Sequence, residues 1–137
     1  MLVLDASVAL SWLFERETAP ERKRAAEALD LLEDKRAVVP ALWRAEVLDG
    51  LLVGERRKLV MPARSAEYLT RLDQLPIEID AASPTARRDA VMELGRSYAL
   101  SAYDATYVEF AMRVGGPIAS FDRHLAKAAG AVGIEVS

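Results

Sequence analysis

The sequence predicts an α/β fold, an α/β/α sandwich around a central, mostly parallel sheet of four to five short strands. The first observation behind this prediction is that short apolar runs alternate with segments of helical periodicity along the whole chain, a pattern typical of parallel sheets covered by helices. The second is that the connecting segments are short and form neither a linker nor an internal repeat. Residues 1–137 are therefore expected to form one domain, within the usual range of domain sizes.

The clearest expected strand is the first, because Leu2, Val3 and Leu4 form an unbroken apolar run suited to burial on both faces of a sheet. The other expected strands are 37–39, 77–79, 117–119 and, as a weaker fifth, 134–136. The expected helices are 6–14, 25–32, 41–58, 62–75, 83–99, 101–114 and 123–129. Ser83 and Pro84 would begin the fifth of these helices as its N-cap and first helical residue.

The long helix expected over residues 41–58 carries a carboxylate beside an apolar face. On a helical wheel that face consists of Leu42, Ala45, Leu48, Leu52 and Val53. Glu46 lies beside it, and an ionised carboxylate next to a core is costly unless something satisfies it. Two interpretations stay open: Glu46 is functional, or it is a partly exposed side chain paired with Arg44 or another arginine.

Composition narrows the chemistry that the chain supports. With no cysteine and a single histidine, His124, disulfides, thiolate sites and sites of several imidazoles are excluded. Any bound metal ion would need oxygen ligands, which favours Mg²⁺ or Mn²⁺. A net charge of −3 gives no sign of a nucleic-acid binder. Local positive charge or a metal ion can nevertheless supply the positive field that attracts a nucleic acid.

No apolar stretch approaches the ~18 residues of a membrane span. The first apolar run lacks a basic leader and meets Asp5 at once, unlike a secretory signal. We therefore expect a cytoplasmic protein that does not contact membranes.

Three more carboxylates lie near the beginnings of predicted helices. Asp5 and Asp122 each follow a strand, and Asp104 lies in the first turn of its helix. Each has an ordinary explanation as a helix cap, and the segment from Ser101 to Asp104 resembles a capping box. Caps do not explain Glu46, however, and ligands bind at the carboxyl edge of open parallel sheets. Because converging carboxylates repel one another unless a cation lies between them, the alternative interpretation is an acidic Mg²⁺ site for phosphate chemistry.

These four acids lie in segments that together resemble a known family. The segments are Leu-Val-Leu-Asp5-Ala-Ser7, Pro40-Ala-Leu-Trp-Arg-Ala-Glu46-Val, Leu100-Ser-Ala-Tyr-Asp104-Ala-Thr-Tyr and Ala119-Ser120-Phe-Asp122-Arg-His-Leu. In order and spacing they resemble the PIN-domain ribonucleases and, within them, the VapC toxins of bacterial toxin–antitoxin pairs. The resemblance covers nearly the whole chain, and the four segments together are far more specific than Asp-x-Ser alone.

The resemblance implies a Mg²⁺- or Mn²⁺-dependent endoribonuclease toxin that is neutralised by a cognate antitoxin and forms a homodimer or a toxin–antitoxin hetero-oligomer. The catalytic residues carried over by position are Asp5, Glu46, Asp104 and Asp122, with Asp5 and Asp104 as the closest metal ligands. Ser7 and Ser120 would hold these acids in place without binding the metal ion themselves. Ser120 stands where relatives often have threonine. Asp49 stands where asparagine is common, so four or five carboxylates could form the site.

A second class of function stays open beside the enzyme. A non-catalytic, Mg²⁺-binding α/β signalling or binding module, such as a receiver domain, also gathers acids at strand ends. It would need a lysine after a later strand, and none occurs between Lys58 and Lys127. A phosphatase of similar architecture would need Asp-x-Asp at the first strand, where Ser7 takes the second position.

Overall fold

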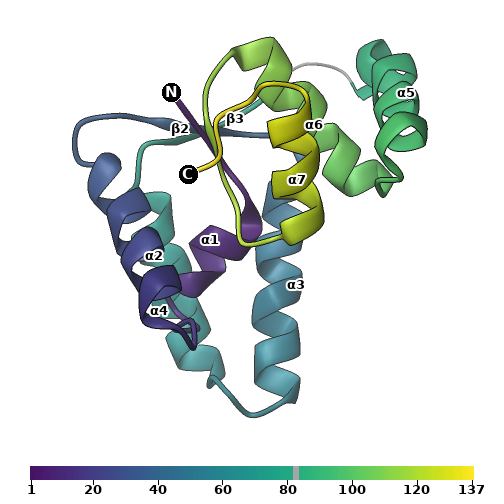
Figure 1. Cartoon of the computed structure of the whole chain (residues 1–137). Coiled ribbons are helices and arrows are strands. Elements are labelled where there is room, and N and C mark those ends of the chain that lie inside the picture. The colour runs from purple at the N-terminus through teal and green to yellow at the C-terminus, as the bar shows by residue number, and fades with distance from the viewer. Residues whose placement is uncertain (82–83) are drawn as a thin grey trace.

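A parallel sheet of four strands forms the centre of the protein, seen here in a computed structural model that describes residues 1–81 and 84–137 (Figure 1). The strands are β1 (Leu2–Leu4), β2 (Ala37–Val39), β3 (Ile77–Ile79) and β4 (Ile118–Ala119). Their order across the sheet is β3-β2-β1-β4, and every neighbouring pair is parallel. The predicted α/β class and the first four predicted strands are therefore confirmed.

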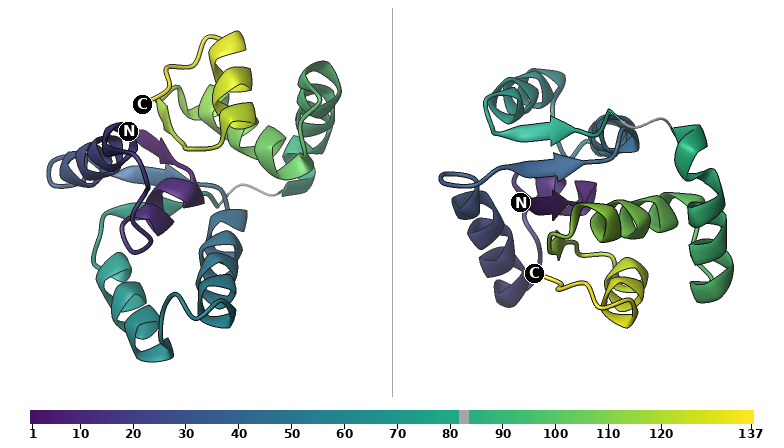
Figure 2. Two further views of the ribbon diagram at one scale, coloured as in Figure 1. Left: turned by 60° about the horizontal axis from the view of Figure 1, so that its bottom comes forward. Right: turned by 90° about the horizontal axis from the view of Figure 1, so that it is seen from above.

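Seven α-helices and one 3-10 turn accompany the sheet within the described residues. They are α1 (Ala6–Ser11), α2 (Ala19–Leu31), α3 (Leu42–Arg56), α4 (Pro62–Asp73), the turn η1 (Pro84–Arg87), α5 (Arg88–Tyr98), α6 (Ala102–Val114) and α7 (Arg123–Ala131). Helices α3 and α4 lie on one side of the sheet and α6 and α7 on the other, while α5 stands at the edge against α6 (Figures 1 and 2). The predicted N-cap Ser83 lies outside the described residues. None of the helices described is long and apolar enough to cross a membrane.

The expected fifth strand is reduced to a single bridge. Val136 pairs with Ile118 in parallel orientation, and the Ile118 amide donates to the Glu135 carbonyl over 2.9 Å. One bridge extends the sheet by a contact rather than by a strand, although Ile134 and Val136 both pack against the core.

Helix α2 begins earlier than its apolar periodicity predicts. Thr18 accepts the Glu21 amide as an N-cap, and Pro20 occupies the first turn, where a missing N–H costs nothing. The predicted helix over 6–14 instead ends at Ser11, after which turns lead through Phe14.

The apolar face predicted for α3 is wrong. The buried residues are Trp43, Val47, Leu51 and Gly54, whereas Leu48 and Leu52 are 47% and 48% exposed. Helix α1 packs directly on α3, and Gly50 allows the approach, because a Cβ there would collide with the Leu10 side chain of α1. Gly54 faces the ring of Phe14, which lies in the turns after α1. Apolar residues occur around most of α3. The hydrophobic pattern alone therefore could not identify the face of α3 that lies closest to α1.

The core lies between the sheet and its helices. Val3, Leu4, Val39 and Ile118 are fully buried strand residues, as expected for strands covered on both faces. Beyond Leu4 and Ala119 the chain reaches Asp5 and Ser120, so β1 and its neighbour β4 deliver polar side chains to the same edge of the sheet.

Candidate active site

Asp5 lies directly after β1 and is only 6% exposed. It occupies the N-cap position of α1, yet its side chain makes no capping hydrogen bond. Instead, the Ser7 and Ser120 hydroxyls both donate to Asp5 Oδ2, over 2.6 and 2.7 Å. The interpretation of Asp5 as a helix cap is therefore wrong, and its carboxylate is held by two serines.

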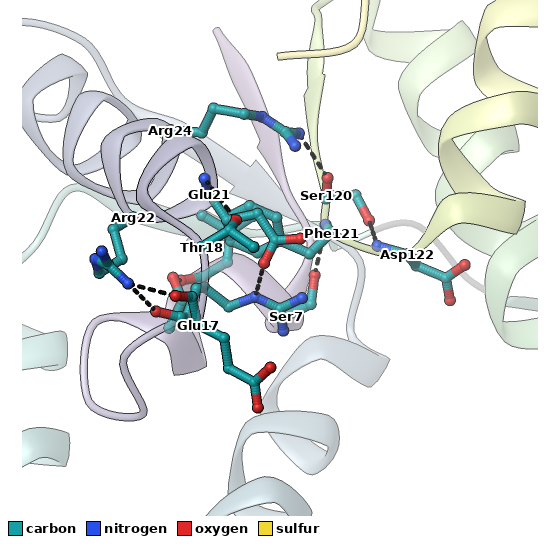
Figure 3. Close-up of polar contacts among 12 residues, drawn as sticks. Ser7, Glu17, Thr18, Glu21, Arg22, Arg24, Ser120, Phe121 and Asp122 are labelled. Atoms are coloured by element: carbon teal, nitrogen blue, oxygen red, sulfur yellow. Dashed lines mark hydrogen bonds and ion pairs between the residues drawn. The ribbon is translucent and has the colours of Figure 1, made fainter.

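The two serines are themselves fixed by the backbone after β4. The Phe121 amide donates to Ser7 Oγ over 3.0 Å, and the Asp122 amide donates to Ser120 Oγ over 2.9 Å (Figure 3). Because each hydroxyl already accepts an N–H, its own proton is directed to Asp5. These hydrogen bonds form a network that joins β1, α1 and the β4–α7 junction.

Glu46 is half-buried on α3, beside the buried face formed by Trp43 and Val47. It is not paired with Arg44 or another arginine in the described residues. Its partner is the buried Tyr107 of α6, whose hydroxyl donates to Glu46 Oε1 over 2.6 Å.

Asp104 and Asp122 stand at the beginnings of two helices on the same side of the sheet. Asp104 is half-buried in the first turn of α6, where its amide donates to the N-cap Ser101 over 3.1 Å. Asp122 caps α7, accepting the His124 and Leu125 amides at Oδ1 over 2.9 and 3.1 Å. The cap interpretation is confirmed for Asp122, although only one of its carboxylate oxygens is used in this way.

The four carboxylates lie close enough to act on one another. Burial, and then the charge of Asp122, raises the pKa of Asp5, while its two serine partners lower it. Burial also raises the pKa of Glu46, with Asp5, Asp104 and Asp122 adding to the rise and Tyr107 opposing it. The pKa of Asp104 is raised by burial and by Asp122 and Asp5, and His124 lowers it.

Asp49 does not join this group. It is exposed on α3, and it is not among the main charges that act on Asp5, Glu46 or Asp104. The carboxylates that act on one another are therefore Asp5, Glu46, Asp104 and Asp122.

The donor set suits a hard divalent cation in type and charge. Every candidate ligand is a carboxylate oxygen, and in the described part of the chain none of the four acids has a cationic side chain within 4.0 Å. Burial and, after it, the charges of neighbouring carboxylates raise the pKa values of these acids, so a bound cation would favour their ionised forms. No three of the described acids already surround a common point, so binding would have to draw their side chains together.

Two contributors to this edge escaped the sequence prediction. Tyr107 lies three residues after Asp104, a spacing that places both on one face of a helix, and that spacing could have found it. Arg24 of α2 donates to the Ser120 carbonyl over 3.0 Å (Figure 3). It also donates to the Ser137 carbonyl over 2.8 Å. No sequence signal predicts these hydrogen bonds of Arg24, because Arg24 and Ser120 are distant in the chain.

These features define an α/β protein with an acidic site at the carboxyl edge of a parallel sheet. The chain belongs to the PIN domain family, whose model matches residues 2–131; proteins of this family are generally nucleases. The crystal structure of PAE2754 from Pyrobaculum aerophilum superposes with a TM-score of 0.69 at 19% identity, over 98% of this chain and 87% of that one. The crystal structure of FitAcB from Neisseria gonorrhoeae gives 0.65 at 20% identity, over 99% and 96%. A comparison with curated proteins found no match.

Proposed function

We propose that this protein is a Mg²⁺- or Mn²⁺-dependent endoribonuclease that hydrolyses RNA phosphodiester bonds as the toxin of a toxin–antitoxin pair. The observation that carries the proposal is the electrostatic convergence of Asp5, Glu46, Asp104 and Asp122 without a cationic partner. Membership of the PIN domain family supports nuclease chemistry. The motif resemblance to VapC toxins supports the toxin role.

In this proposal Asp5 and Asp104 hold the metal ion, and Glu46 and Asp122 act directly or through water. When bound, the ion would polarise a phosphoryl oxygen and lower the pKa of a water molecule. The two serines keep the Asp5 carboxylate in one orientation, and their hydrogen bonds favour its ionised form. Glu46 and Asp122 are the groups that can orient the attacking water and take its proton.

The arginines of the chain differ in their access to this edge. Arg16 pairs with Glu21 over 2.8 Å and lies over the ring of Phe121, the residue before Asp122, 4.6 Å from its centroid. Arg87 pairs with the buried Glu109 of α6 over 3.5 Å. Arg56 ends α3, remote from the strand ends (Figure 1). We therefore propose Arg16 as an RNA contact.

The partners are proposed on the resemblance: a cognate antitoxin, and a homodimer or toxin–antitoxin hetero-oligomer in the cytoplasm. The exposed Leu48 and Leu52 on α3 offer apolar area for assembly. Trp43 and Leu32, by contrast, belong to the core of the domain.

The test is RNA cleavage by the purified, antitoxin-free protein with Mg²⁺, with Mn²⁺ and with EDTA. Asp5→Asn and Asp104→Asn should each abolish metal-dependent cleavage, whereas Asp73→Asn, an exposed acid on α4, should leave it intact. Total RNA and structured RNAs serve as substrates, and Mn²⁺ calorimetry runs in parallel. Uptake of Mn²⁺ that requires Asp5, without cleavage of any RNA, would instead favour the non-catalytic binding module. Absence of both would contradict the proposal.

A further inference from the structure

Tyr107 joins α6 to α3 at the acidic edge through its hydroxyl group. Its side chain is 1% exposed within α6. The hydroxyl donates to Glu46 Oε1 on α3 over 2.6 Å. Because an ionised carboxylate only accepts hydrogen bonds, the hydroxyl proton points to Glu46.

Among the described residues, Glu46 is the only one of the four acids to which this hydroxyl donates. Asp5 has two serine donors and Asp122 has two amide donors. For Glu46, the bond from Tyr107 is the one hydrogen bond to its carboxylate recorded among the described residues. A glutamate has one more rotatable bond than an aspartate, so its carboxylate needs such a restraint more.

We propose that Tyr107 is a positioning residue, which holds Glu46 Oε1 and thereby leaves Oε2 as the oxygen that serves the metal side of the site. This inference rests on the proposed metal-dependent function. Asp104 and Tyr107 are one turn apart on α6, so a single helix supplies an acid of its own and the orientation of an acid on α3. A shift of α6 relative to α3 would change both together.

Tyr107→Phe tests the proposal, because phenylalanine keeps the buried ring and removes only the donor. Tyr68→Phe is the matched control: Tyr68 is also buried, and its hydroxyl donates to the Ala9 carbonyl on α1 rather than to an acid. Isothermal titration calorimetry with Mn²⁺ on the full chain gives a readout independent of cleavage. Loss of a group that orients a ligand commonly weakens metal binding by about 10–100-fold.

Tyr107→Phe is expected to raise the Mn²⁺ dissociation constant at least ~10-fold, whereas Tyr68→Phe should change it less than ~2-fold. In a Glu46→Ala background, Tyr107→Phe should have no further effect on that constant, because the group it positions is gone. Similar melting temperatures for the two phenylalanine variants would show that the difference arises at the site.

Two outcomes would overturn the proposal, and they are distinguishable. If the parent chain takes up Mn²⁺ and Tyr107→Phe does so equally well, Tyr107 has no positioning role and the proposed function stands. If the parent chain takes up no Mn²⁺, the proposed function fails and the role of Tyr107 with it.

Discussion

Ser120 follows β4 and Asp5 follows β1, and the hydroxyl of the first donates to the carboxylate of the second over 2.7 Å. The bond forms because β1 and β4 are parallel neighbours and their carboxyl ends coincide. Ser120 also accepts the Asp122 amide, so one hydroxyl links two of the four acids. The orientation of these acidic side chains therefore depends directly on the pairing of β1 with β4.

Ser120→Ala should weaken the site without removing an acid. The variant loses a donor that lowers the pKa of Asp5, so that pKa rises further. Protons then compete better with the metal ion, and the pH at which Mn²⁺ binds at a given concentration should move upward. Calorimetric Mn²⁺ titrations across a pH series measure this shift.

The control is Ser65→Ala. Ser65 is equally buried, but its hydroxyl has no hydrogen-bond partner among the described residues. It should leave the pH dependence unchanged. Loss of the bond to a buried carboxylate should also cost Ser120→Ala about 1–3 kcal/mol of unfolding free energy, and equal behaviour of the two variants would contradict the role of Ser120.

Asp5→Asn should stabilise the metal-free protein while destroying its site. The folded-state pKa of Asp5 is raised above the ordinary 3.8, so the folded chain holds this proton more tightly than the unfolded chain. The free energy of unfolding therefore falls as pH rises through the window from 3.8 to the raised pKa. Glu46 and Asp104, whose pKa values are also raised, add to the loss.

Urea unfolding in EDTA measures this effect. At about pH 7 the Asn variant should exceed the parent by on the order of 1 kcal/mol, and the difference should shrink towards acid pH. Mn²⁺ at 100 times its dissociation constant should then add about 2.7 kcal/mol to the parent and nothing to the variant. A less stable Asn variant in EDTA at neutral pH would show that the Asp5 charge is compensated without metal.

The strands and the four acids were accessible from the sequence because both depend on local pattern. Leu2 to Leu4 is an uninterrupted apolar run, and Asp5 ends it at the place where the chain leaves the sheet. The role of Ser7, two residues further on, was implied by the resemblance to the PIN-domain ribonucleases. Asp122 was also predicted as a helix cap, which depends only on neighbouring amides.

The contacts between elements were not accessible in the same way. The partners Glu46 and Tyr107 are 61 positions apart, and no spacing rule joins them. The buried face of α3 depends on α1 approaching at Gly50, and a hydrophobic pattern assigns a glycine no face. Leu48 and Leu52 were consequently predicted to be buried, although they are about half exposed.

Arg113→Gln should destabilise the fold away from the acidic edge. Arg113 on α6 pairs with Asp80, after β3, over 2.8 Å and with the buried Glu109 over 3.1 Å. Removing the cation leaves poorly solvated carboxylates with less compensation, a change that costs about 3–5 kcal/mol in fully buried pairs. Because Arg113 and Asp80 are partly exposed, we expect about 1–3 kcal/mol.

The comparison for Arg113 is Arg36→Gln. Arg36 makes an equally short 2.8 Å ion pair with Glu78, but both side chains are more than half exposed. Pairs of this kind contribute about 0–1 kcal/mol. Chemical denaturation of the two variants should therefore separate them clearly, and equal losses would show that burial of the Arg113 network adds nothing.

Gly116→Ala should destabilise the β4 side of the sheet, because a Cβ at Gly116 would collide with the Met1 carbonyl oxygen. That obstacle is backbone, which cannot rotate away, so the chain leading into β1 or β4 must shift. Overpacking of this kind costs about 1–3 kcal/mol.

Gly130→Ala provides the opposite case, since Gly130 lies within α7 and a Cβ there meets nothing within 4 Å. Helix propensity predicts a gain of up to about 1 kcal/mol for that substitution. Thermal melts of both variants in EDTA should move in opposite directions, and a Gly116→Ala protein as stable as the parent would show that the two chain segments are not held in contact.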